Sequence, residues 1–440
     1  MKKRIRPFDL TIIVISLVIG MGIFRTPSEV AEKAGSIEIF FLAWLAGSLI
    51  SFVGALTFAE IGSRKPMTGG FYKIFSVCYS PAFAFMVNWI TVISNAASTA
   101  AVAIMGSTYL ASVFFPESVA TSTQLIAIVT TLGLLGVNLL GIRVSVAVLN
   151  TLMILKILLL LILISAVFFI SKEWISETHI ESVTHATPSW KSFIMCFVPV
   201  FFTFGGYQQT MNFGGDIDNP SRVLPRSIFY AMIVILILYL SVNYSYYKVL
   251  GLEGLANTKT LAADTAKVIF GDWSGMIISI VMFFAVMTYV NVSIMSNPRV
   301  YYAMAEDKVL PPLFLKVNEK TNVQTYGVIV FCGFIFLTLF FVSSFQKILE
   351  YVMFFDSISL ITAASAIFIL RKRKEGEHLE IFKLKGYPWI PILYIAVYAG
   401  VNYAVFLSNP SAFMWGAILF ISGLPLYYLI RGFITRSMRR

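Results

Sequence analysis

Charged side chains are scarce in this sequence, and their scarcity excludes most soluble folds. Only 12% of the 440 residues are Asp, Glu, Lys or Arg, whereas 58% are hydrophobic. An ordinary globular chain carries roughly 25% charged residues. A surface with so few charges is not solvated by water, so the composition indicates a protein whose solvent is the lipid bilayer.

Cysteine and histidine are also rare. The three cysteines, Cys78, Cys196 and Cys332, lie in or beside apolar stretches and form no CxxC motif. They predict small core side chains rather than a disulfide framework or a zinc site. The three histidines fall in polar gaps, and we expect neither a metal ion nor another cofactor.

The net charge of +11 does not indicate nucleic-acid binding, because no basic helix or aromatic-basic platform is present. Lys and Arg gather in alternate gaps between apolar stretches, which is how membrane proteins mark their cytoplasmic side. Residues 2–4 and 439–440 are basic, whereas the gap around residues 116–117 has no Lys or Arg. Both termini are therefore predicted to be cytoplasmic, which requires an even number of spans. The first apolar stretch has no cleavage site and is expected to remain as a helix.

Twelve apolar stretches are long enough to cross a bilayer, since about 20 helical residues span its hydrocarbon core. They are continuous rather than alternating, so the predicted fold class is an all-α membrane protein with 12 transmembrane helices. The expected spans lie near 8–34, 38–63, 81–115, 123–141, 145–170, 190–214, 226–250, 273–304, 324–343, 347–371, 387–407 and 411–431.

Glycine interrupts the first and the sixth span, at Gly20-Met21-Gly22 and at Gly205-Gly206. These spans are equivalent if the chain is an inverted 5+5 repeat followed by two C-terminal helices. Paired breaks of this kind point to a transporter binding site. Where a helix unwinds, amide N–H groups can hold a carboxylate and carbonyls can accept from an ammonium, so a zwitterion needs no charged side chain.

Four motifs then occur in the order typical of a known family. They are Ile19–Pro27, Ala59–Gly62 with Pro66–Gly70, Phe202–Tyr207 with its exit at Asn219-Pro220 and Leu224–Arg226, and Ala303–Pro311. Over about residues 7–375 the chain resembles the amino acid–polyamine–organocation (APC) transporters. It is most similar to the L-type amino acid transporters and their bacterial relatives.

The resemblance implies a leucine-transporter-like fold with helices 1 and 6 unwound. Residues 1–371 would form the transport core, with helices 1–5 near 8–170 and helices 6–10 near 190–371. Residues 372–440 would add a cytoplasmic loop and helices 11 and 12. Phe202 would close over the substrate as a gate. The implied substrate-binding residues are Val18, Gly20, Met21, Gly22, Phe202, Thr203 and Gly205, with the amides of Gly20–Gly22 facing the carboxylate and the other carbonyls facing the ammonium.

Lys156 stands in the middle of the fifth span. A lysine among lipid tails costs about 3 kcal/mol or more unless it faces the bundle interior, so it predicts a functional site. The alternative is a lysine that snorkels to the interface. In the resembling family a lysine here fills the sodium site of related carriers, touching a carbonyl near Val18–Gly20 and the hydroxyl of Ser293. Transport should then be independent of sodium.

Asp356 is an unusual charge in the tenth span. It predicts either a proton-coupling or selectivity site, or a hydrogen-bonded structural carboxyl, and the sequence leaves both open.

We therefore expect sodium-independent amino acid transport by alternating access, as an exchanger or a proton symporter, in a bacterial inner membrane. A cationic amino acid or polyamine carrier, an amino acid sensor and a channel on the same fold remain alternatives. A membrane enzyme would need a motif such as HExxH, which is absent from the sequence. A major facilitator carrier would leave the paired breaks unexplained. The expected partners are the amino acid and the bilayer, without nucleic acid or an obligatory protein subunit, so a monomer should be competent.

Overall fold

The computed structural model describes residues 6–67, 70–165, 168, 190–214, 217, 219–258, 260–341, 345–377, 381–408 and 410–437. Several features of the sequence lie outside these residues. They are the basic residues 2–4 and 439–440, Thr68-Gly69 of the second motif, and most of the gap between the fifth and sixth spans.

The described residues are folded almost entirely into helices, and an isolated β-bridge joins Asn318 and Val323. The helices before the gap are α1 (Pro7–Val18), α2 (Gly22–Ala34), α3 (Ile37–Arg64), α4 (Gly70–Cys78), α5 (Pro81–Phe114), η1 (Pro116–Ser118), α6 (Val119–Leu140) and α7 (Ile142–Ser165). After it come α9 (Trp190–Phe204), η3 (Tyr207–Asn212), α10 (Pro220–Asn257), α11 (Leu261–Phe270), α12 (Asp272–Ser296), α13 (Pro298–Glu306), η4 (Pro312–Leu315), α14 (Thr325–Phe341), α15 (Phe345–Lys372), α16 (Trp389–Ser408) and α17 (Pro410–Ser437).

Within the described residues, seven helices are long and apolar enough to cross a membrane. The count rises to eight if α1 and α2, which meet at an angle of 41°, form one span. Each of the twelve stretches expected from the sequence contains at least one helix. The all-helical membrane fold predicted from composition is thereby confirmed.

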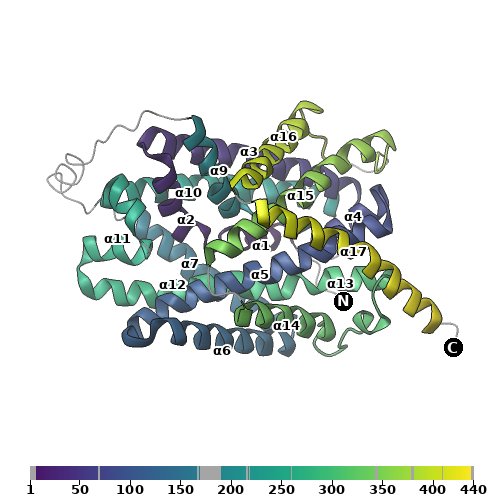
Figure 1. Cartoon of the computed structure of the whole chain (residues 1–440), viewed down its shortest axis with the longest axis horizontal. Helices are drawn as coiled ribbons and strands as arrows, with labels where there is room; N and C mark the ends of the chain where they lie inside the picture. The colour runs from purple at the N-terminus through teal and green to yellow at the C-terminus, as the bar shows by residue number, and fades with distance from the viewer. Residues whose placement is uncertain are drawn as a thin grey trace.

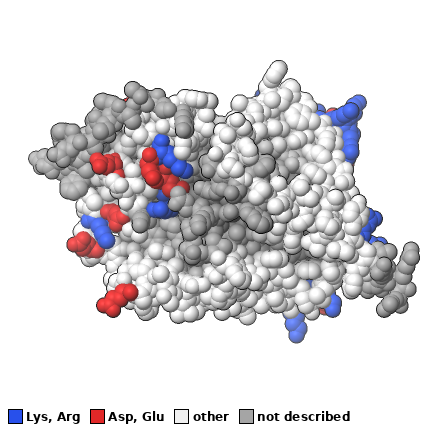
Figure 2. Space-filling view, in the orientation of Figure 1, with Lys and Arg blue, Asp and Glu red and all other residues white. Residues whose placement is uncertain are grey.

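The outer helices carry apolar side chains toward the surroundings, as a lipid environment requires. Leu125 and Val129 of α6 are 63% and 60% exposed, and Ile154 and Leu158 of α7 are 62% and 52% exposed. Figure 2 shows charged side chains gathered at the two ends of the visible face, with a broad band of other residues between them. This distribution matches a protein whose middle lies in hydrocarbon.

The broken segments lie inside the bundle, where other helices surround them. α1 contacts α10, α12 and η3, whereas α2 packs against α9 and α10. The long helix α5 crosses the molecule beside α12, and α6 and α14 flank it along the lower edge of Figure 1. α16 lies against α3, α9 and α15. A site built at the breaks is therefore shielded from lipid on several sides.

Candidate functional site

The two glycine-containing breaks meet in space. α1 ends at Val18 and α2 begins at Gly22, while α9 ends at Phe204 and is followed by η3 from Tyr207. A Cβ added at Gly22 would lie 2.7 Å from the Cα of Thr203. Gly22 therefore allows the start of α2 to approach the end of α9 directly.

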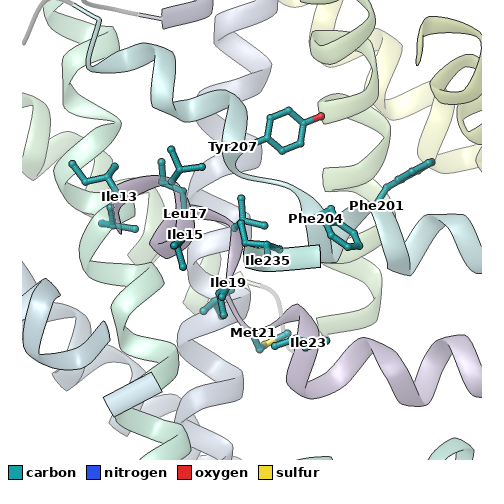
Figure 3. Packing of buried hydrophobic residues seen from close by; sticks show 14 of the residues in the cluster. Ile13, Ile15, Leu17, Ile19, Met21, Ile23, Phe201, Phe204, Tyr207 and Ile235 are labelled. Atoms are coloured by element: carbon teal, nitrogen blue, oxygen red, sulfur yellow. The ribbon is translucent and has the colours of Figure 1, made fainter. Parts of the chain in front are cut away.

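The contact is repeated in the opposite direction at Gly206. This residue has a φ of +115°, which favours glycine, and a Cβ on it would lie 2.7 Å from the carbonyl carbon of Leu17. Each break thus uses one glycine to approach the backbone of the other. Figure 3 shows Ile19 and Met21 on the segment that joins the two halves of the first span, with Phe204 of α9 nearby.

Hydroxyl groups join the two breaks as well. The Thr26 and Thr203 hydroxyls are hydrogen-bonded to each other. The Tyr239 hydroxyl, on α10, lies 3.0 Å from the Val18 carbonyl oxygen and 3.2 Å from that of Thr203. A phenol has a single donor, so Tyr239 donates to one carbonyl at a time and bridges the end of α1 to the end of α9.

A cavity of about 40 Å³ opens where the breaks meet. All seven residues that the resemblance assigns to the substrate line it, namely Val18, Gly20, Met21, Gly22, Phe202, Thr203 and Gly205. The fold therefore brings together the residues that the resemblance implies as binding residues.

Some of the backbone groups at this cavity already have partners. The Gly20 N–H donates to the Val18 carbonyl at 2.7 Å, and the Gly205 N–H donates to the Phe202 carbonyl at 3.2 Å. α2 begins with no side-chain cap on its N-terminus. The first amide groups of a helix have no acceptor within it, so those at Gly22 and Ile23 are suited to an anion.

The helical face on which Lys156 lies explains why it is buried. Met153 and Leu160, three residues before and four after it, are 2% and 0% exposed. Ile154 and Leu158 lie on the opposite face toward lipid. At 3.6 residues per turn this spacing turns Lys156 into the bundle, where it is 0% exposed.

The ammonium of Lys156 donates to the carbonyl oxygen of Ile19, within the first break. Among the described residues no carboxylate forms an ion pair with it. The Ser293 hydroxyl, expected from the resemblance to contact Lys156, is instead hydrogen-bonded to Thr99 at 2.8 Å and to the Asn297 amide at 3.2 Å. The Lys156 ammonium therefore contacts the first break, whereas the Ser293 hydroxyl belongs to a hydrogen-bonded group with Thr99 and Asn297.

Asp356 on α15 also lines the cavity, and Ser94 of α5 donates to its carboxylate at 3.2 Å. It is therefore near the breaks rather than at the lipid surface.

Several lining residues were not anticipated from sequence. They are Asn95 and Ser98 of α5, Gln208 and Gln209 of η3, Tyr289 of α12, Leu360 of α15 and Tyr398 of α16. The polar pair on α5 had a signal, because Thr91, Ser94, Asn95, Ser98 and Thr99 repeat at helical spacing on one face.

A buried ionic cluster lies beyond the cavity, at the end of α3. Glu60, 0% exposed, accepts from Arg64 at 2.7 Å and from two nitrogens of Arg371 at 2.7 and 2.9 Å. It also accepts from the backbone N–H of Leu384 at 2.7 Å. Arg371 lies 311 residues from Glu60 along the chain, so only the folded structure brings the two together. The cluster ties α3 to α15 and to the segment before α16.

Comparison with known proteins decides the family. The amino acid permease family model matches residues 5–429. The chain belongs to this family. It lies within the APC superfamily, so the resemblance seen in the sequence motifs is confirmed.

Individual relatives extend over nearly the whole permease chain. The serine/threonine exchanger SteT of Bacillus subtilis is 27% identical over 431 residues, covering 97% of both chains. The mouse Asc-type amino acid transporter 1 is 24% identical, covering 98% of this chain and 81% of its own. The rabbit large neutral amino acids transporter small subunit 2 is 25% identical, with 98% and 80% covered.

Proposed function

We propose that this permease carries amino acids across the membrane by alternating access without sodium, as an exchanger or a proton symporter. The observation that carries the proposal is the meeting of two broken segments at one cavity, with the Lys156 ammonium fixed on the first break. Membership of the amino acid permease family supports the class of substrate.

In this proposal the substrate is held mainly by backbone. The amides of Met21 and Gly22, at the uncapped start of α2, would face the carboxylate, and the Gly20 amide would join them on leaving the Val18 carbonyl. The ammonium would be received by carbonyls of Val18, Phe202, Thr203 and Gly205. Because the Tyr239 hydroxyl donates to only one of the Val18 and Thr203 carbonyls at a time, the other carbonyl is available to a substrate ammonium. Phe202, partly buried on the wall of the cavity, would close over the bound amino acid.

Lys156 provides the reason for independence from sodium. A sodium ion at a broken helix is coordinated by backbone carbonyls, and here a fixed cation already occupies such a carbonyl. We propose that the Lys156 ammonium replaces the sodium ion as the cation bound to the first break. Ser293 would support the site by joining α12 to α5 through its hydrogen bond with Thr99.

The proposed architecture has twelve spans, with an inverted 5+5 repeat in residues 1–371 and two further helices in residues 372–440. The right edge of Figure 2 carries mostly Lys and Arg, and α17, described as far as Ser437, runs toward the same side in Figure 1. With an even number of spans, this distribution favours cytoplasmic termini under the positive-inside rule. The bacterial relative SteT favours a bacterial inner membrane.

The substrate is proposed to have a small neutral side chain, because the cavity is small and Asn95, Ser98 and Gln209 contribute polar groups to it. SteT, named as a serine/threonine exchanger, is consistent with this choice. The name of the rabbit relative describes a small subunit, and hence an assembly with another chain for that protein. We propose that the present chain transports as a monomer.

Asp356 supports a second candidate, a carrier of cationic amino acids or polyamines. A carboxylate on the cavity wall can pair with a positively charged side chain. If it does, arginine, lysine and putrescine should compete with uptake in the wild type and should compete less in Asp356→Asn. Equal competition in both proteins would contradict this candidate.

The test of the proposed function is uptake of radiolabelled amino acids into sodium-free proteoliposomes, either empty or preloaded with unlabelled amino acid. Uptake that requires preloading identifies an exchanger, and uptake into empty vesicles that rises with an inward proton gradient identifies a symporter. Binding of amino acids without uptake in either condition would identify a sensor and contradict the proposal. Uptake only with external sodium would contradict the role given to Lys156.

A further inference from the structure

α16 stands outside the inverted repeat, yet it contacts the second break on both sides. Its Tyr398 ring is stacked on Phe201 of α9, with centroids 4.8 Å apart and planes at 19°. Its Tyr394 hydroxyl is hydrogen-bonded to the Tyr207 hydroxyl of η3 at 2.8 Å. Phe201 precedes the break and Tyr207 follows it, so one face of α16 joins both halves of the broken span.

This contact is part of a continuous column of rings. Phe197 is stacked on Phe201, with ring centroids 5.1 Å apart and planes at 13°. The ring centroids of Tyr394 and Tyr398 are 4.7 Å apart. The residues are spaced by four on α9 and by four on α16, which places them on one face of each helix. Phe201, Tyr394 and Tyr398 are 1%, 0% and 1% exposed, so the column is shielded from lipid.

The backbone of α3 is shaped to receive this column. A Cβ added at Gly54 would lie 2.7 Å from Cδ2 of the Tyr394 ring. The same ring makes an edge contact with Phe58 at 5.9 Å. Tyr394 is therefore held in position from α3 while its hydroxyl reaches η3.

Tyr398 also lines the cavity, beside Phe201, Asp356 and Leu360. Tyr398 thus lines the cavity proposed for the substrate and also contacts α9, the helix that precedes the second break.

We propose that α16 is part of the transport machinery: Tyr398 forms a wall of the substrate cavity that limits side-chain size, and Tyr394 positions η3 through Tyr207. The inference rests on the proposed function. The proposal gives α16 a role in substrate specificity and in transport rate, although this helix lies outside the proposed inverted repeat.

The experiment compares variants of the full chain in sodium-free proteoliposomes, with Tyr403 as a matched control. Tyr403 lies on the same helix but is 63% exposed. Tyr398→Ala should strengthen inhibition of uptake by phenylalanine relative to alanine about tenfold, since the added space admits a larger side chain. Tyr403→Ala should leave that ratio unchanged.

The positioning role is tested with variants that retain the ring. Tyr394→Phe and Tyr207→Phe should each lower the maximal exchange rate by about twofold to tenfold with little change in KM. The double variant should be no slower than the slower single variant, because both remove one bond. Tyr403→Phe should behave as the wild type.

Wild-type behaviour of Tyr398→Ala and Tyr394→Phe would overturn the inference alone, provided that the unmodified protein exchanges amino acids. A wild type that transports no amino acid would overturn the proposed function and this inference together. Additive losses in the double variant would overturn the positioning role of the Tyr207–Tyr394 bond.

Discussion

The two breaks that border the cavity are held by different kinds of groups. At the first, the Ile19 carbonyl accepts from the Lys156 ammonium, which comes from α7. At the second, the described bonds come from neutral hydroxyls: Thr203 is bonded to Tyr239 and Thr26, which also connect it to the first span, and Tyr207 is bonded to Tyr394. Charge-assisted hydrogen bonds are roughly twice as strong as neutral ones.

This difference suggests a division of labour between the two segments. We infer that the first break is the fixed half of the site, because a buried ammonium without its acceptor would be very costly. The second break is the adjustable half, since hydroxyl contacts can be exchanged at a cost of about 1 kcal/mol each. The proposed gate, Phe202, lies on this second half.

The largest effect is expected from removing the cation at the first break. Lys156→Met preserves much of the side-chain volume but leaves the Ile19 carbonyl without its charged donor. Exchange should slow by about tenfold to a hundredfold, which corresponds to a hydrogen bond to a charged group. The rate should be measured beside Lys316→Met, an exposed lysine. Near-normal exchange in Lys156→Met would show that the first break does not depend on a fixed charge.

A backbone change at the second break should be the next largest. Gly206→Ala forces a Cβ against the Leu17 carbonyl at a φ of +115°, and such strain costs about 1–3 kcal/mol before any steric overlap is counted. Thermal unfolding should occur at a lower temperature than in the wild type. Gly136→Ala is the control, because a Cβ there meets nothing within 4 Å. Equal stability of the two variants would contradict the close approach of the breaks.

The proposed gate should give a smaller and more specific effect. Phe202→Ala removes a ring whose burial over a bound substrate is worth about 1.5–3 kcal/mol. We expect KM for the amino acid to rise about tenfold, whereas Phe284→Ala, on the lipid-facing side of α12, should leave it unchanged. An unaltered KM in Phe202→Ala would contradict the role of Phe202 as a gate.

Tyr239→Phe should have the smallest effect, because its hydroxyl contributes one neutral hydrogen bond shared between two carbonyls. The exchange rate should change about twofold to tenfold. Tyr230→Phe, on the same helix and 61% exposed, provides the comparison. A loss as large as that of Lys156→Met would contradict the weaker contribution assigned to neutral hydroxyls.

The first half of the site was easier to predict from sequence than the second. Gly20, Gly22 and Lys156 are conspicuous because glycine pairs and a charge interrupt apolar runs. Tyr239 and Tyr398 were missed because tyrosine in a membrane helix usually indicates an interfacial anchor. Only the tertiary structure shows that their hydroxyls and rings turn inward.

The hydrogen-bond partners on distant helices could not be predicted from the sequence either. Lys156 was expected to contact both the first break and Ser293, but the structure joins it to Ile19 and gives Ser293 to Thr99. Helical periodicity predicts which face of a helix a residue occupies. It does not specify which residue of a neighbouring helix lies opposite, because that depends on how far each helix is shifted along its axis.

The central claim, that unwound backbone binds an amino acid zwitterion without sodium, is tested most directly by ligand-induced stabilisation of the purified protein in sodium-free buffer. Serine and alanine should raise the unfolding temperature, whereas the methyl esters, which lack the carboxylate, and lactate, which lacks the ammonium, should not. Addition of sodium should leave these shifts unchanged. Stabilisation by the ester or by lactate equal to that by the amino acid, or stabilisation only with sodium, would contradict the account.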